Sequence, residues 1–154
     1  MSKLLDLRKA IRTVLTTGAN PLWEEAAVII RRRTKIWNDV AIAVENSRHR
    51  SCLVVGVAKG DPDRSRKPKS RLTIMDVTVP VTLIELPQVD PEGEEEDELW
   101  EATVMALQGN DLGRVGTGCQ HDFAFDGFDE VPDDKYVIRQ TLFRTRVILN
   151  PDSP

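Results

Sequence analysis

The chain has 154 residues and a mass of 17.3 kDa, a size that suits one domain with a single buried core. Hydrophobic residues make up 40% of the sequence and charged residues 30%, which excludes a wholly disordered chain. No run reaches the roughly 18 apolar residues of a membrane-spanning helix, so we expect no membrane association.

The two cysteines, Cys52 and Cys119, are too few for a disulfide scaffold and fit a reducing compartment. Charged residues interrupt the first 15 residues every few positions, unlike the apolar core of a secretory signal. We therefore expect synthesis in the cytoplasm.

The net charge of −4 conceals a strong polarity along the chain. Residues 1–71 contain 16 Lys and Arg against 7 Asp and Glu, and residues 72–154 contain 5 against 18. The two parts thus carry net charges of +9 and −13, and such a chain tends to present surfaces of opposite sign. Either the basic part binds polynucleotide, or basic and acidic faces of neighbouring copies associate.

Hydrophobic spacing predicts two helices and two strands in the first third of the chain. Residues 2–17 read as an amphipathic helix with Ser2 as N-cap and Gly18 after its end. The apolar run at 26–30 predicts a strand, and residues 52–58 (CLVVGVA) predict a strand buried on both faces. Between the strands we expect a second helix that Thr34 caps, with an apolar face of Ile36, Trp37, Val40, Ala41 and Val44.

A basic arm and a long alternating strand are predicted next. Residues 59–71 (KGDPDRSRKPKSR) combine Gly, Pro, Ser and six basic residues, which predicts a mobile loop or hairpin arm. Residues 72–86 alternate apolar and polar positions, as a strand with one buried face does. Pro80 within this strand indicates an edge position or a bulge, because proline cannot donate to the hydrogen-bond ladder.

The remainder predicts an acidic linker, a helix and a closing hairpin. Residues 88–98 are acidic and lead into a helix over 95–107. Residues 123–129 and 136–149 predict two paired strands, in which Arg139 is the one exception on an otherwise apolar face. This order predicts a single α+β domain with a mostly antiparallel sheet and helices packed on one face. The expected buried side of the third helix contains Leu99, Trp100, Thr103, Val104, Ala106 and Leu107.

The clusters that could carry chemistry are weak. Cys119, His121 and Asp122 lie close together, but the sequence has no partner motif that would complete a metal site. Cys52 lies in an apolar strand and reads as an inert core residue, while His49 between two arginines reads as a solvated helix end. We predict no catalytic residue, metal site or cofactor, and keep a hydrolase that uses the Cys119 cluster as an open hypothesis, for which tightly bound metal would be the sign.

The densest basic feature lies within residues 59–71. Closely spaced cations bind phosphates by releasing counterions. No aromatic residue interleaves them, so base stacking is unsupported and nucleic-acid binding is expected to be non-specific at most. A solvated hairpin tip, or an arm that contacts an acidic protein surface, fits better. These cations are Arg64, Arg66, Lys67, Lys69 and Arg71.

The whole pattern resembles the tail terminator, or tail completion, proteins of long-tailed bacteriophages and prophages. The resemblance rests on the first helix (LLDLRKAIRTVL), the stretch CLVVGVAKGDPDRSRKPKSRLTIMDVTVPVTLIEL, the helix EEDELWEATVMALQG and the hairpin FAFDGFDEVPDDKYVIRQTLFRTRVIL. It covers about 120 of the 154 residues and consists of element order and texture. The sequence departs from the pattern at residues 20–50, where an extra strand and helix are inserted.

The resemblance implies a structural virion protein. Such a subunit forms a homo-oligomeric ring, typically a hexamer, at the head–tail junction. The ring caps the tail tube, stops its polymerisation and offers a surface to the head connector, or stopper, protein. The family needs no cofactor and is not enzymatic.

The charge polarity suggests which residues make the contacts. We hypothesise that the basic arm, or the acidic residues Glu94, Glu95 and Glu96, contact a neighbouring subunit, the tube or the connector. The alternative is a DNA-contacting head–tail completion protein that uses Arg64 to Arg71 on phosphates.

Overall fold

The computed structural model describes residues 2–31, 36–62, 73–87, 94–113, 117–119 and 122–149, with backbone alone at 61–62 and 94–96. Within these ranges the chain forms three α-helices, one short 3₁₀ helix and six strands. Their bounds are α1 Lys3–Thr16, a 3₁₀ turn at Glu25–Ala27, β1 Val28–Ile30, α2 Trp37–Asn46, β2 Ser51–Val55, β3 Lys59–Pro62, β4 Thr73–Glu85, α3 Glu94–Leu107, β5 Ala124–Val131 and β6 Val137–Leu149.

The strands form one sheet, ordered β1-β2-β4-β6-β5, and β3 pairs with β4 beyond the end of β2. β1 is parallel to β2, and the other pairings are antiparallel. The α+β class with a mostly antiparallel sheet is therefore confirmed. β1 lies at one edge of the sheet and β5 at the other.

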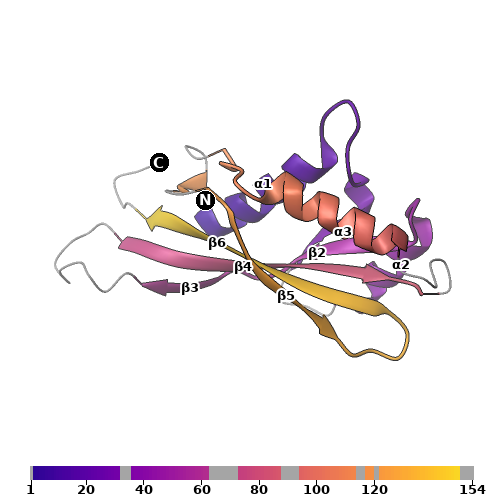
Figure 1. Cartoon of the computed structure of the whole chain (residues 1–154). Coiled ribbons are helices and arrows are strands. Elements are labelled where there is room, and N and C mark those ends of the chain that lie inside the picture. Colours follow the sequence, from indigo (N-terminus) through magenta and orange to yellow (C-terminus); the bar gives the residue numbers. More distant parts are fainter. Residues whose placement is uncertain are drawn as a thin grey trace.

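The two faces of the sheet are covered by different helices. α1 and α3 lie together on one face (Figure 1), where Leu7 and Leu107 join a core that includes Leu53 and Phe143. α2 packs on the opposite face, where Val40 and its neighbours meet Cys52, Val54, Ile84 and Ile138. The expectation of helices on one face thus holds for α1 and α3 and fails for α2, because β2 is apolar on both sides and needs cover on both.

The ends of α1 follow the sequence signals. The Ser2 hydroxyl accepts a hydrogen bond from the Leu5 backbone N–H at 3.2 Å, so Ser2 is the N-cap. Gly18 adopts a φ of +108° just beyond the helix, a conformation that disfavours residues with a Cβ. Both predictions are confirmed.

The predicted face of α2 is wrong at Trp37. Its side chain is 51% exposed and stacks on Tyr136 with ring centroids 6.1 Å apart. The helix begins at Trp37, so this residue sits at the end of the apolar stripe, while Val40, Ala43 and Val44 bury the centre. Thr34, the expected cap, lies outside the described residues.

Pro80 occupies a central strand, so the edge interpretation is wrong. β4 pairs with β6 through Pro80 without a register shift, and the extra residue lies on the other side, between β2 and β3. β2 pairs with residues 81–85 of β4, and β3 pairs with residues 75–78. Residues 56–58 therefore face only 79 and 80, which is a local bulge. The Pro80 carbonyl accepts a hydrogen bond from the Gly56 N–H at 2.7 Å, so the side of Pro80 that lacks an N–H faces this break.

The start of the predicted basic arm is a strand. Residues 59–62 form β3, which confirms the hairpin alternative at this end, and residues 63–71 lie outside the described part of the chain.

The closing hairpin is confirmed as β5 and β6, with Thr141, Phe143, Thr145 and Val147 buried.

Two tryptophans fix α3 in place. The Trp23 indole N–H donates to the Thr103 hydroxyl at 2.9 Å, and that hydroxyl donates to the Leu99 carbonyl at 2.7 Å. On the sheet side, the Trp100 indole N–H donates to the Thr141 hydroxyl at 2.8 Å. α3 is thereby bonded to the segment before β1 and to β6 at once.

We predict that Thr103→Val lowers the free energy of unfolding by about 1–3 kcal/mol, because the buried Trp23 N–H loses its acceptor. Urea denaturation measures the change. Thr13→Val, at an exposed helical threonine, is the matched control and should change stability by less than about 0.5 kcal/mol. Equal stability of the two variants would contradict the anchoring role of Thr103.

We also predict that Gly56→Ala destabilises the fold by about 1–3 kcal/mol through overpacking. A Cβ at this position would lie 2.6 Å from Pro80 Cγ. Adding Pro80→Ala should recover part of the loss because it removes that atom. The control is Gly60→Ala, where the nearest atom would be at 3.5 Å. If Gly56→Ala unfolds at the same urea concentration as the Gly60 variant, the close approach is not a constraint.

Candidate functional site

The residues predicted to make partner contacts are not among the side chains that the structure describes. Arg64, Arg66, Lys67, Lys69 and Arg71 lie in the undescribed range 63–72. Glu94, Glu95 and Glu96 form the first turn of α3, with only their backbone described. Their role in contacts stays a prediction, and the described residues point to two further charged surfaces.

The first surface is a basic groove at the β1 edge of the sheet. The groove has a volume of about 750 Å³ and runs beside α1, β1 and the end of β2. Its apolar lining includes Val28 and Ile30, whereas Ile29 packs against the core under α2 on the opposite face of the sheet. Its charged lining residues are Arg8, Lys9, Arg12 and Arg31, without an acidic one.

Helical spacing brings these cations together. Arg8 and Arg12 are four residues apart and so share a face of α1 with Lys9 beside them. The Arg8 guanidinium donates to the Arg31 carbonyl at 2.8 Å, which ties α1 to the end of β1. Partial burial lowers the pKa of Arg8 from its ordinary value, yet an arginine remains protonated at neutral pH. The groove is therefore positively charged.

The second surface is the acidic edge, which we define as β5 with its flanking residues, 122–135. This segment contains six Asp and Glu against one Lys. Every β5 residue is exposed except Gly127, which is half-buried. Phe128 is 52% exposed and Val131 43% exposed. An edge strand of this length with exposed apolar side chains is an unusual feature unless another chain covers it.

Arg139 holds the acidic edge against α3. Its guanidinium forms ion pairs with Asp97 at 2.9 Å and Glu130 at 3.1 Å, and its side chain is only 11% exposed. It also lies over the rings of Trp100, at 5.0 Å, and Phe128, at 5.4 Å. The one charged exception on the apolar face of β6 is thus explained, and the contacts keep β5 in a fixed position.

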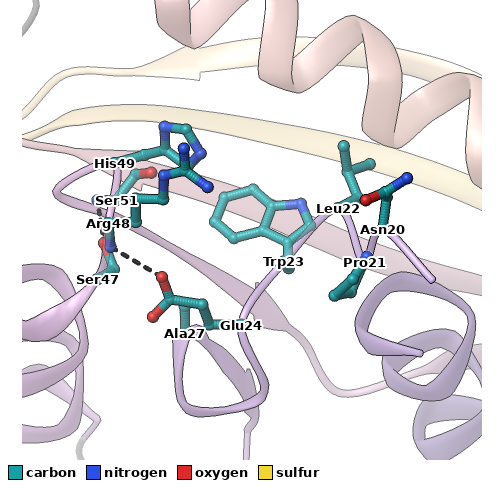
Figure 2. Close-up of a pocket in the computed structure, with 10 residues that line it drawn as sticks. All are labelled: Asn20, Pro21, Leu22, Trp23, Glu24, Ala27, Ser47, Arg48, His49 and Ser51. Carbon is teal, nitrogen blue, oxygen red and sulfur yellow. Dashed lines mark hydrogen bonds between the residues drawn. The ribbon is translucent and has the colours of Figure 1, made fainter. Parts of the chain in front are cut away.

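The hollow drawn in Figure 2, about 300 Å³ in volume, lies where the segment before β1 meets the turn between α2 and β2. The Trp23 indole lies between the proline–leucine pair on one side and His49 on the other (Figure 2). Glu24 accepts a hydrogen bond from the Arg48 backbone N–H at 3.2 Å. This hydrogen bond links the segment before β1 to the turn between α2 and β2. His49, expected at a solvated helix end, is half-buried in the wall of the hollow.

The structure separates two members of the Cys119 cluster. Cys119 is buried in the core below α1 and α3, whereas Asp122 is exposed. His121 lies outside the described residues. Among the side chains that are described, no three or more His, Cys, Asp or Glu form a group that could hold a metal ion.

Sequence reasoning missed both the basic groove and the role of Arg139. A signal was present for each: Arg8, Lys9 and Arg12 fall on one helical face, and Arg139 interrupts an apolar one. What the sequence could not show is that β1 brings Arg31 beside α1, because that contact joins segments distant in the chain.

Comparisons with known proteins return no family model and no curated protein that matches this sequence. None of the helices in the described ranges is long and apolar enough to span a membrane.

Cys52 allows a test of the core that α2 covers. Burial raises the pKa of its thiol from 9.0 to about 12. Above pH 9 the unfolded chain releases this proton and the folded chain keeps it, so raising the pH lowers the free energy of unfolding. In a Cys119→Ala chain at pH 9, we predict that iodoacetamide labels native Cys52 at least about a hundredfold more slowly than in urea. Equal rates in the two conditions would contradict the burial of Cys52.

Proposed function

We propose that this protein is a tail terminator of a long-tailed bacteriophage or prophage. The observation that carries the proposal is the arrangement of charge on the sheet: the basic groove lies at the β1 edge and the acidic edge at the opposite side. A subunit with two different, complementary ends suits head-to-tail assembly, which produces a ring when the rotation between subunits closes.

The energetic argument depends on the sum of many charges. A single exposed ion pair contributes only about 0.2–1 kcal/mol. The acidic edge and the groove each gather several charges of one sign, so their summed field favours contact between unlike edges and opposes contact between like edges. Such selection of orientation is what a ring requires.

The element order gives further support. The segments on which the resemblance rests contain, in order, α1, β2, β3, β4, α3 and the β5–β6 hairpin. The described part of the inserted residues 20–50 contains the 3₁₀ turn, β1 and α2. The insertion therefore contributes β1 and Arg31 to the basic groove, so that the departure from the family pattern takes part in the proposed assembly surface.

In this role the protein acts through shape and surface, without a cofactor or a chemical step. Its ring sits on the last ring of the tail tube protein at the head–tail junction of the virion. The family resemblance implies that this ring is a hexamer. It ends tube growth and presents its other side to the head connector. Synthesis takes place in the cytoplasm of the bacterial host.

We predict that the purified chain limits the length of tubes that the tube protein of the same phage forms in vitro. Negative-stain images should show a ring at one end of each tube, and light scattering should show a mass that rises with protein concentration. Both effects should weaken as NaCl rises from about 50 mM to about 500 mM, because salt screens exposed charges.

Tubes of unaltered length at a several-fold excess of the chain would refute the proposal. A DNA affinity that falls steeply with salt, in a chain that leaves tube length unchanged, would instead favour the DNA-contacting alternative.

A further inference from the structure

The two edges of the sheet differ in more than charge. β5 has β6 on one side, and no described strand pairs with its other side. Its exposed apolar side chains include Phe128, on the face that α3 covers, and Val131, on the face that α2 covers. At the opposite edge, the groove beside β1 is lined by apolar residues together with four cations. One edge thus presents apolar side chains within negative charge, and the other an apolar recess within positive charge.

We infer that the acidic edge of one copy docks in the basic groove of the next copy. The inference rests on the proposed ring and names the contact that builds it. Phe128, on the face of the sheet that α3 covers, supplies apolar area for the groove beside α1, where Ile30 lies. The carboxylates around Phe128 face the cations of α1 and Arg31, so burial of apolar surface and charge pairing act in the same contact.

Pairing of β5 with a second β5 is disfavoured by the same residues. A symmetric contact would place Asp126, Asp129 and Glu130 of two copies close together, and like charges across an interface are costly. Groove-to-groove contact would likewise oppose arginines to arginines. Only the contact of an acidic edge with a basic groove brings opposite charges together at both edges. A contact between two different surfaces can repeat around a ring.

Contacts within the subunit also fix the conformation of the acidic edge before a second copy binds. Arg139 binds Glu130 and Asp97, and Trp100 packs against Phe128 with ring centroids 4.6 Å apart. Because β5 is already fixed against α3, little conformational entropy is lost when a second copy covers it.

The test exchanges the charges of the two edges. The first variant is Lys9→Glu/Arg12→Glu in the groove, and the second is Asp129→Lys/Asp134→Lys on the acidic edge. The second leaves Asp126, Glu130 and Asp133 intact, since they contact Arg144, Arg139 and the turn backbone. Each variant alone should associate at least about tenfold more weakly than wild type. The groove falls from four net positive charges to zero, or the acidic edge from five net negative charges to one, and the attraction between the edges is largely lost.

An equal mixture of the two variants should restore assembly. In an alternating ring, one kind of contact joins the native edge to the native groove, and the other places the introduced lysines opposite the introduced glutamates. Such a ring closes only with an even number of subunits. Light scattering and negative-stain images measure the outcome at about 100 mM NaCl, where charges are only partly screened. Circular dichroism and urea unfolding establish that each variant is folded.

The controls separate this inference from the proposed function. Glu101→Lys, on the exposed side of α3, should assemble as wild type does. If wild type forms rings and caps tubes but the mixture does not recover, the edge contact is wrong and the proposed function stands. If either folded variant assembles alone as well as wild type, the edge contact is equally overturned. A wild-type chain that neither self-associates nor caps tubes overturns both.

Discussion

The pairing of β4 with β6 positions the other parts of the molecule. The two strands match residue by residue over 13 positions, from Thr73 opposite Leu149 to Glu85 opposite Val137. Their apolar positions alternate, so a shift of one residue would move the buried set to the other face. β2 and β3 pair with β4 on one side and β5 with β6 on the other, so this single register fixes the distance and orientation between the two charged edges.

The core supports that register from both faces. Two hydrogen bonds hold α3 in place: Trp23 donates to Thr103 of α3, and Trp100 of α3 donates to Thr141 of β6. Neither indole N–H is left unpaired. α2 covers the other face beside β2. The result is a rigid platform whose edges, rather than an enclosed pocket, carry the charge, and this is the basis for proposing assembly as its function.

Several elements were predictable because their signals are local. The cap of α1, the positive φ of Gly18 after that helix and the alternation in β4 depend on residues within a few positions of one another. Pro80 was predictable only as a choice between an edge and a bulge. The choice depended on Gly56, 24 residues earlier, whose N–H bonds to the Pro80 carbonyl at the break between β2 and β3.

The amino-acid sequence by itself determined the α+β class, the order of the elements and the separation of basic from acidic residues along the chain, because periodicity and composition are written in neighbouring positions. The tertiary structure decided where those charges lie. The pairing of β1 with β2 places Arg31 beside α1, and the bulge at Gly127 turns both Phe125 and Phe128 toward Trp100. Strand order and register arise from contacts between distant segments, and a linear pattern does not contain them.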